Sequence, residues 1–295
     1  MFWKTGEDFL IKVKGNAKIN LTLDILGKRE DGYHEVSMVM QSIGLHDTLE
    51  MERAAEGIFL EIDVPGLEAD ESNLAWKAAD LMIRRFCLKG GVHIRLTKRI
   101  PIAAGLAGGS TDAAAVLRGM KELYGLGLSQ EELCQMGAEL GSDIPFCLMG
   151  GTMLSTGRGE VLKRLPDLPK MPVVLAKPGI SVSTAWAYRN YDESGAKRHP
   201  DNEAVQRALM DGDGVAVSKL MCNVLESVTE KKYDIISKYK TMMMEQGALA
   251  SMMSGSGPTV FALVGSMEEA EKIGAFMRRN TDAEVFVTQT VGGMD

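Results

Sequence analysis

Apolar and polar residues alternate along the first part of the chain, which predicts β-strands with one buried face. Two such runs flank Gly15-Asn16, and we expect a turn at this dipeptide that joins two strands. Later runs at 36–43, 58–64 and 92–98 predict further strands, and "GKREDGYHEV" is typical of a polar loop. The alternating apolar residues of the first two runs are Phe9, Ile11, Val13, Ile19, Leu21, Leu23 and Ile25.

The middle of the chain has the apolar spacing of helices. One helix is predicted to begin near Ser72 and to end at "KGG". Two more are predicted over 110–124 and 129–140. The second of these opens with a capping box formed by Ser129 and Glu132.

After "GSDIPFCLMGG" the pattern starts again with "PVVLAKP", which predicts a short buried strand. Several helices are predicted over 184–246, and "ALASMMSGSGPTVFALVG" predicts two strands around a glycine turn. Ser266 and Glu269 cap a further helix, and "EVFVTQT" predicts a last strand. Strands and helices mix without regular alternation, so we predict an α+β fold of two domains, 1–158 and 159–295.

The composition is that of an ordinary globular protein, with 45% hydrophobic and 25% charged residues. A net charge of -7 argues against a general binder of nucleic acids or membrane surfaces. An anionic partner would therefore need local cations, helix N-termini or a metal. The four cysteines form no close pair, which favours free thiols. With no signal peptide or membrane-spanning run recognisable, we expect a cytoplasmic protein.

The segment "PIAAGLAGGSTDAAAVLRGM", residues 101–120, places glycines directly before a predicted helix. Glycines let backbone N–H groups approach an anion, and a helix start adds unsatisfied donors and a positive dipole end. Ser110 or Thr111 is expected to cap this helix while a hydroxyl reaches phosphate or metal. We therefore predict a phosphate site, although a purely structural turn has the same pattern. The loop lacks the lysine of a Walker motif, and we interpret Asp112 as a helix-start anion.

Three segments occur in the order and at the spacing of the GHMP small-molecule kinases, and the chain resembles this family over nearly its whole length. The segments are "GNAKINLTLDILGKREDGYHEV", "PIAAGLAGGSTDAA" and "MMSGSGPTVFAL". Two residues depart from the family pattern, Ala107 in place of glycine and Thr111 in place of serine. The resemblance implies an active site between two domains, with ATP bound by 1–158 and the substrate pocket shaped by 159–295.

The resemblance also implies a reaction, the transfer of the terminal phosphoryl group of ATP to a hydroxyl group. Asp143 in "GSDIPF" would accept the hydroxyl proton, and Lys18 in "NAKIN" would hold Asp143 ionised and stabilise developing negative charge. Without the resemblance, Asp143 is typical of a loop or helix cap, and Lys18 is typical of a solvated strand face. "DGYHE" and "GSDIPF" favour a cytidine-diphosphate sugar alcohol as acceptor over homoserine or mevalonate. An ATP-dependent decarboxylase of the same fold and a non-catalytic nucleotide-binding module stay as alternatives.

The remaining site residues follow from the same resemblance. Asn20, on the strand face of Lys18, would contact the substrate or Lys18, and Mg²⁺ is expected with ATP, Ser110 and Asp143 being candidate ligands. The turn 254–259 is expected to support the glycine loop. The residues expected to contact the cytidine acceptor are Tyr33, by stacking, His34, by polar contact to the base edge, Tyr188, as a second aromatic, and Thr184. The residues expected to hold ATP are Pro101, Ile102, Ala103, Ala104, Gly105, Leu106, Ala107, Gly108, Gly109, Ser110 and Thr111.

Overall fold

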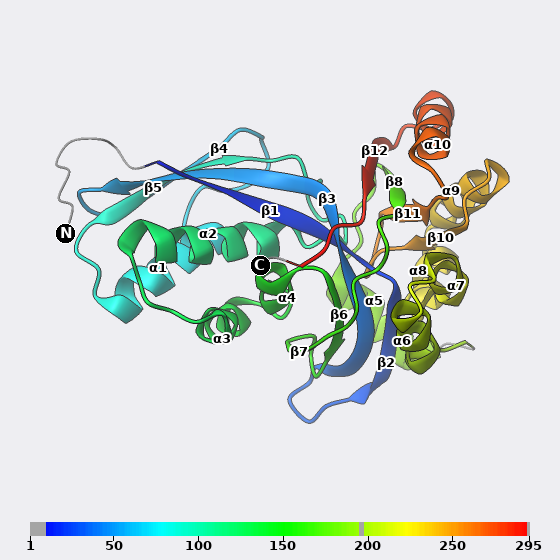
Figure 1. The fold of residues 1–295 in the computed structure, drawn as a ribbon, viewed down its shortest axis with the longest axis horizontal. Helices are drawn as coiled ribbons and strands as arrows, with labels where there is room; N and C mark the ends of the chain where they lie inside the picture. Colours follow the sequence, from blue (N-terminus) through cyan, green and yellow to red (C-terminus); the bar gives the residue numbers. More distant parts are fainter. Residues whose placement is uncertain (1–9, 195–197, 294–295) are drawn as a thin grey trace.

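The computed structural model describes residues 10–194 and 198–293, which form two lobes that lie side by side (Figure 1). The predicted α+β class is confirmed, and Phe9 lies outside the described residues. The first lobe contains β1 (Ile11–Asn20), β2 (Thr22–Lys28), β3 (His34–Ala54), β4 (Ile58–Ile62), α1 (Leu74–Phe86), β5 (Gly91–Thr97), α2 (Gly108–Tyr124), α3 (Gln130–Leu140), α4 (Ile144–Met149), β6 (Thr152–Thr156) and β7 (Val161–Arg164).

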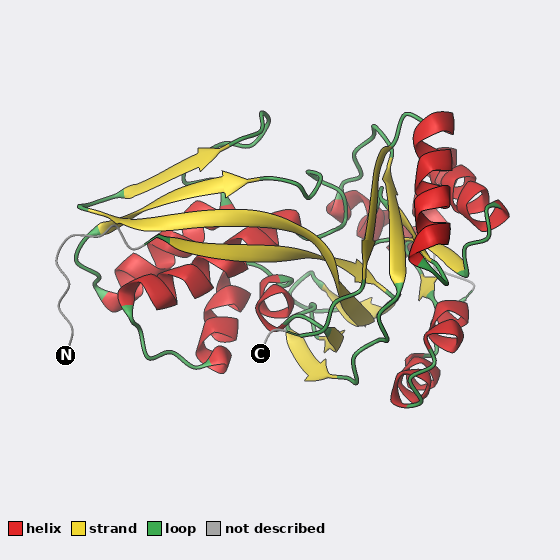
Figure 2. Cartoon of the chain, turned by 45° about the horizontal axis from the view of Figure 1, so that its top comes forward, coloured by secondary structure: helices red, strands yellow, loops and turns green. Residues whose placement is uncertain are grey.

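The second lobe carries a four-stranded antiparallel sheet in the order β10-β11-β8-β12. Helices α9 and α10 pack on one of its faces, and its other face packs against the first lobe (Figure 2). The elements of this lobe are β8 (Pro172–Lys177), α5 (Thr184–Ser194), α6 (Asn202–Met210), α7 (Gly214–Leu220), β9 (Cys222–Asn223), α8 (Glu226–Lys232), α9 (Asp234–Glu245), β10 (Ala250–Met253), β11 (Val260–Leu263), α10 (Met267–Asn280) and β12 (Glu284–Gln289).

Strand β3 is the axis of the first sheet. It is antiparallel to β1 and β5 along one half and to β2 and β6 along the other. Helix α2 packs on β1 and β3, and α1 packs on α2, so the helices of this lobe cover one face of the sheet (Figure 2). The loop "DGYHE" lies where β2 turns back into β3, at one end of this long hairpin.

The predicted turn at Gly15-Asn16 is wrong, because β1 runs through both residues and pairs them with Asp47 and His46. Instead of forming a turn, Gly15 allows α2 to approach β1 closely. A Cβ at this position would lie 3.0 Å from the carbonyl oxygen of Thr111, so a side chain here would push α2 away from the strand. The chain reverses later, in the polar loop 29–33.

The pairing of β1 with β3 shifts between Asn16 and Lys18, and this irregularity changes which face the side chains take. Before it, Val13 packs toward α2. After it, Ile19 lies in the core shared with the second sheet, and Lys18 faces the opposite side. The buried residues of that shared core include Ala17, Ile19, Leu21, Val39, Leu106, Val173, Leu175, Phe261 and Leu263.

Backbone pairing ties the two lobes together. Strand β9 of the second lobe runs parallel to β2 of the first, and isolated bridges join Ile43 to Thr290 and Gly150 to Gly293. The division after residue 158 falls in the turn between the paired strands β6 and β7, so β7 belongs to the sheet of the first lobe but lies after this division. The two domains 1–158 and 159–295 stay a proposal. The four cysteines are free, as predicted, and no described helix is long and apolar enough to cross a membrane.

Helix α2 begins at Gly108, two residues before the predicted start, and the expected cap by Ser110 or Thr111 is wrong. The N-cap residue is Ala107, in the left-handed conformation with φ 59°, and its side chain makes no capping hydrogen bond. Thr111 instead donates its hydroxyl to the carbonyl of Asn16 at 2.8 Å. The caps predicted for the helices after Ser129 and Ser266 are confirmed.

The left-handed Ala107 yields a prediction about stability. An alanine in this conformation is strained by roughly 1–2 kcal/mol, and glycine relieves the strain while adding unfolded-chain entropy. We expect Ala107→Gly to leave the protein as stable as the wild type or more stable by about 1 kcal/mol, measured by urea unfolding. Ala104→Gly is the matched control in the same loop, where φ is not positive, and it should destabilise. Equal destabilisation by both changes would contradict the prediction.

Candidate active site

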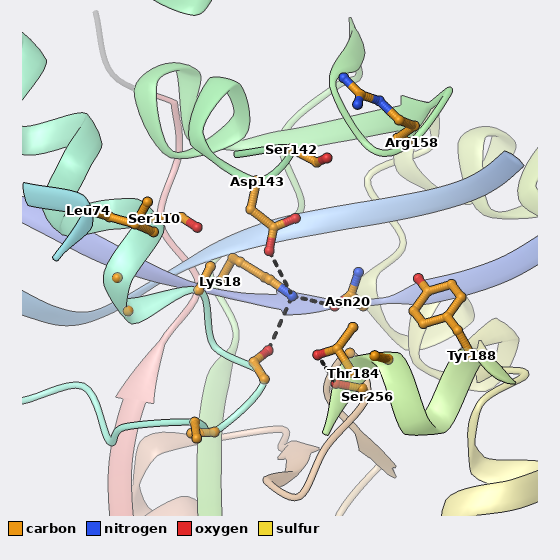
Figure 3. Close-up of a pocket in the computed structure, with 18 of the residues that line it drawn as sticks. Lys18, Asn20, Leu74, Ser110, Ser142, Asp143, Arg158, Thr184, Tyr188 and Ser256 are labelled. Carbon is orange, nitrogen blue, oxygen red and sulfur yellow. Dashed lines mark hydrogen bonds and ion pairs between the residues drawn. The ribbon is translucent and has the colours of Figure 1, made fainter. Parts of the chain in front are cut away.

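A cavity of about 1070 Å³ lies between the two lobes. Known sites for one small molecule are usually of about 300–1,000 Å³, so this cavity lies at the upper end of the range for ligand sites. It receives side chains from β1, the 29–34 loop, the glycine loop, α5 and the residues just before α4. Those from β1, from the residues before α4 and from α5 are seen in Figure 3. The predicted residues that line it are Lys18, Asn20, Tyr33, His34, Pro101, Ile102, Ala103, Ala104, Gly105, Ala107, Gly108, Gly109, Ser110, Asp143, Thr184 and Tyr188.

Two of the predicted ATP-binding residues do not line the cavity. Leu106 packs into the core between the sheets, and its carbonyl accepts a hydrogen bond from the backbone N–H of Lys18. The buried side chain of Thr111 bonds to Asn16. Both residues therefore anchor the glycine loop to β1 and have no side-chain atoms facing a ligand.

The ammonium group of Lys18 is the centre of the site. It donates to Asn20 Oδ1 at 2.8 Å and to the carbonyl of Gly105 at 3.1 Å, and it lies 4.0 Å from Asp143 Oδ2 (Figure 3). The Lys18 side chain is 6% exposed, whereas that of Asp143 is 33% exposed. A buried ammonium group is stable only beside hydrogen-bond acceptors and opposite charge. Asn20 and the Gly105 carbonyl accept two of its hydrogen bonds, whereas Asp143, at 4.0 Å, forms an ion pair without a hydrogen bond. The Asp143 carboxylate stays open to the cavity.

Asp143 occupies the N-cap position of α4, as a helix cap would, but its side chain makes no capping hydrogen bond. Pro145 in the first turn has no N–H to be capped, which reduces the demand for a cap. The carboxylate is thus free to act in the cavity. Its neighbour Ser142 also lines the cavity, which the sequence did not predict.

The turn 254–257 packs directly on the glycine loop, as predicted. Ser254 Oγ donates to the carbonyl of Gly105 at 3.0 Å, the same oxygen that accepts from Lys18. Gly105 has a φ of +75°, and a Cβ there would lie 2.3 Å from the carbonyl of Ser254. Buried Asn223 on β9 donates to the carbonyls of Met253 and Gly255, at 2.8 Å each, and so holds the turn.

A buried charge cluster that the sequence did not predict lies behind the start of α2. Lys98 Nζ is 2.5 Å from Asp47 Oδ2 and 2.7 Å from Asp112 Oδ2. Burial raises the pKa of Asp112 to about 7, with Lys98 opposing this and Asp47 adding to it. Asp112 lies one turn inside α2 and pairs with Lys98. It is therefore not the helix-start anion that the sequence predicted. Asp47 Oδ1 also accepts the backbone N–H of Ile100, so the cluster fixes the entry into the glycine loop.

The predicted base-binding residues gather at the other end of the cavity. His34 Nε2 lies 2.7 Å from Asp192 Oδ1, and the ring centroids of His34 and Tyr188 are 5.0 Å apart. The pKa of the Tyr188 phenol is raised, chiefly by burial and also by the nearby carboxylate of Asp143. Tyr33 is 55% exposed, and the guanidinium group of Arg158 lies over its ring at 5.0 Å.

Thr184 lies at the start of α5 and contacts the turn 254–257, with its hydroxyl 2.9 Å from that of Ser256 (Figure 3). The sequence did not predict Arg158, Asp192 or Ser256 as site residues. Arg158 and Asp192 are charged side chains in polar segments, where a sequence offers no sign of the partner they face. Among the described residues, no group of three or more His, Cys, Asp and Glu side chains could hold a metal ion.

Comparison with known proteins places the chain in a family. The family descriptions "GHMP kinases N terminal domain" and "GHMP kinases C terminal" match residues 73–151 and 203–283. The 4-diphosphocytidyl-2-C-methyl-D-erythritol kinase of Acetivibrio thermocellus is 47% identical over 95% of this chain and 99% of that protein. The enzyme of the same name from Pelotomaculum thermopropionicum is also 47% identical, over 95% of this chain and 98% of that protein.

Solved structures agree with this placement. A crystal structure of 4-(cytidine 5'-diphospho)-2C-methyl-D-erythritol kinase, 32% identical, superposes with a TM-score of 0.83 over 96% of this chain and 100% of that one. A homoserine kinase from Cytophaga hutchinsonii is 21% identical and has a TM-score of 0.77 over 99% of this chain and 98% of that one, so it shares the fold. The chain therefore belongs to the GHMP kinases and, within them, to the family of the 4-diphosphocytidyl-2-C-methyl-D-erythritol kinases.

Proposed function

We propose that the protein transfers the terminal phosphoryl group of ATP to the 2-hydroxyl of 4-diphosphocytidyl-2-C-methyl-D-erythritol, a step of the non-mevalonate route to isoprenoid precursors. The observation that carries the proposal is the Lys18–Asp143 pair, which faces the same cavity as the glycine loop. The names of the relatives at 47% identity support the choice of acceptor. The cytoplasmic location stays a prediction.

Phosphoryl transfer needs a positioned hydroxyl, a proton acceptor and positive charge near the phosphoryl oxygens. Asp143 is the proton acceptor, since its carboxylate is open to the cavity and makes no capping bond. Lys18 places a fixed positive charge beside Asp143 and the reacting groups. Because Asn20 and Gly105 hold the ammonium group, it needs no rearrangement during the reaction.

The start of α2 is the proposed site for the ATP phosphates. Within the described residues, no side chain caps the first turn, so the N–H groups of Gly108, Gly109 and Ser110 are free to bind phosphate oxygens. The dipole of α2 adds positive potential at the same end. This local arrangement explains how a chain of net charge -7 would bind an anion.

The cavity suits a Mg²⁺ ion that arrives with ATP. Mg²⁺ prefers oxygen ligands and is commonly bound by one or two carboxylates together with substrate phosphates. Ser110 and Asp143 supply such oxygens, and Asp112 Oδ1 is a buried oxygen with no hydrogen-bond partner in the described structure. We propose Ser110 and Asp143 as the residues that would hold the ion, which would neutralise phosphate charge.

The cytidine end of the acceptor would occupy the region of Tyr33, His34 and Tyr188. Tyr33 and Tyr188 offer aromatic faces for stacking, and His34 offers a polar edge. Asn20, which accepts from Lys18, and Thr184, which contacts Ser256, are the proposed contacts of the sugar alcohol (Figure 3).

The proposal is tested by one incubation with ATP, Mg²⁺ and the cytidylyl-methylerythritol acceptor, followed by phosphorus NMR. We expect a new phosphomonoester resonance together with ADP, and no carbon dioxide. Homoserine and mevalonate serve as control acceptors. Turnover of a control acceptor, with none of the cytidylyl compound, would overturn the proposed acceptor.

The catalytic pair gives the first prediction on activity. Asp143→Asn keeps the shape but cannot take up a proton, and Lys18→Met keeps the length but loses the charge. We expect each change to lower kcat on the order of 10²-fold or more, with smaller changes in KM. Lys12→Met is the matched control, because Lys12 lies on the same strand but is exposed, and its kcat should not change. Near-normal turnover of a folded Asp143→Asn variant would remove Asp143 from the role of base.

The glycine loop gives the second prediction, which concerns ATP binding. A Cβ at Gly108 would lie 3.2 Å from both Ile100 Cγ2 and Lys98 Nζ, so Gly108→Val crowds these two side chains and is expected to disturb the start of α2. We expect ATP affinity to fall about 10-fold or more, by calorimetry, because the phosphate-binding N–H groups move. Binding of the cytidine acceptor should survive. Gly127→Val, where a side chain meets open space, is the control. Unchanged ATP affinity in Gly108→Val would make the loop a structural turn.

Base stacking gives the third prediction, which concerns the choice of acceptor. Stacking contributes roughly 1–3 kcal/mol and does not distinguish bases, so Tyr33→Ala should weaken the cytidine and uridine acceptors alike. His34→Ala should instead narrow the difference between them, because it removes a contact to the base edge. The measurement is kcat/KM for both acceptors. Phe59→Ala is the control, since Phe59 is as exposed as Tyr33, at 55%, but lies outside the cavity. Wild-type constants in both cavity variants would place the base elsewhere.

A further inference from the structure

A buried carboxylate holds the end of β10 from outside the cavity. Met253 is the last residue of β10, which lies at the edge of the second sheet and, among the described strands, pairs in that sheet with β11 alone. Two side chains bond to the backbone of Met253. Glu226 Oε1 accepts its N–H, and Asn223 donates to its carbonyl, at 2.8 Å each. These two side chains therefore take the place of a neighbouring strand.

The carboxylate of Glu226 is engaged through both of its oxygens. Glu226 is the first residue of α8, and its side chain is 17% exposed. Burial raises the pKa of this carboxyl group above its ordinary value, while the ion pair with Lys240 opposes the rise. Lys240 Nζ, on α9, lies 2.8 Å from Glu226 Oε2 and 2.6 Å from Glu230 Oε1. One oxygen of Glu226 thus pairs with the lysine, and the other fixes the end of the strand.

The residue after Met253 carries this fixed position to the reacting groups. Ser254 Oγ donates to the Gly105 carbonyl, the oxygen that also accepts from Lys18. A Cβ at Gly255 would lie 3.4 Å from Lys18 Nζ, so the turn packs against the ammonium group itself. The position of the strand end therefore determines where the turn meets the glycine loop and the lysine.

We propose that Glu226 is a positioning residue for phosphoryl transfer, because it fixes the turn 254–257 through the N–H of Met253 and so holds Lys18 in place beside Asp143. Glu226 and Lys240 lie outside the cavity, so the effect is expected on kcat and not on substrate affinity. Small displacements of reacting groups lower rates strongly, even when their cause lies far from the chemistry. The inference rests on the proposed function, since it concerns the reacting groups of the same site.

The test compares Glu226→Gln with Glu226→Asp, which separate reach from charge. Glutamine keeps the length of the side chain and an oxygen that can accept from Met253, but it loses the charge. Aspartate keeps the charge that faces Lys240, but it is one methylene shorter and withdraws from the N–H. We expect kcat of Glu226→Asp to fall about tenfold, with KM of both substrates within about twofold. The kcat of Glu226→Gln should stay within about threefold of the wild-type value.

A double-mutant cycle with Ser254→Ala shows whether the effect passes through the turn. If Glu226 acts through the hydroxyl of Ser254, Glu226→Asp should lower kcat little further once that hydroxyl is removed. Independent effects would multiply. Glu230→Gln is the matched control, because Glu230 lies on the same helix and pairs with the same lysine but is not bonded to Met253. Its kcat should be that of the wild type.

Nitrogen-15 NMR of the Lys18 ammonium group in the unliganded protein gives a second measurement. We expect its signal to move in Glu226→Asp in the same direction as in Ser254→Ala, because both changes release the contact with the Gly105 carbonyl. The signal should stay at its wild-type position in Glu230→Gln.

Three results would each overturn the inference: a wild-type kcat in Glu226→Asp, a kcat in Glu226→Gln as low as in Glu226→Asp, or effects that multiply in the cycle with Ser254→Ala. Failure of the proposed function looks different, because the wild type would then phosphorylate no acceptor. The NMR measurement needs no acceptor and decides in that case, since an unchanged Lys18 signal in Glu226→Asp also overturns the inference.

Discussion

The burial of one ammonium group is the constraint on which this active site depends. Lys18 has almost no contact with solvent, so its charge is tolerated only while hydrogen-bond acceptors and an opposite charge lie beside it. Asn20, the Gly105 carbonyl and Asp143 come from β1, the glycine loop and the start of α4. These three segments must therefore converge for the protein to fold with a charged Lys18. The same convergence brings the proposed base next to the proposed phosphate loop.

The second lobe supports this arrangement through the backbone. Ser254 shares the Gly105 carbonyl with Lys18, and Asn223 holds the turn that carries Ser254. Asn223 lies on β9, which pairs with β2, the strand that follows Lys18 and Asn20. The connections thus form a closed path from β1 through the glycine loop and the second lobe back to the first sheet. A change at Asn223 is expected to disturb the reacting groups without touching a ligand.

Charge is arranged locally in this acidic chain. The uncapped start of α2 presents N–H groups to the cavity, while Lys98 behind it is paired with Asp47 and Asp112. Because the carboxylates offset the lysine, most of the attraction for phosphate must come from backbone donors, the helix dipole and any cation bound with ATP. At the other end of the cavity, Asp192 and His34 offer directional hydrogen bonding in place of net charge.

The sequence by itself determined the fold class, most strands and helices, the capping box at Ser129 and the motif order that identifies the family, because these depend on neighbours in the chain. It also determined that Lys18 and Asn20 share a strand face, since side chains alternate. Only the tertiary structure decided which face that is. If the side chains alternated without a break, the apolar residues from Ile11 to Ile25 would all lie on one face of the sheet. The irregular pairing after Asn16 instead turns Lys18 to the face that lines the cavity and Ile19 to the opposite face.

The same limit explains the residues that the sequence missed. Asp47 meets Lys98, Asn223 meets Gly255 and His34 meets Asp192 across separations of 51, 32 and 158 residues. Each is an ordinary polar residue in its own segment, and the partner that makes it part of the site is brought to it by packing. Gly15 shows the limit most clearly. A glycine beside an asparagine suits a turn, and only the approach of α2 shows that its missing side chain serves a helix contact.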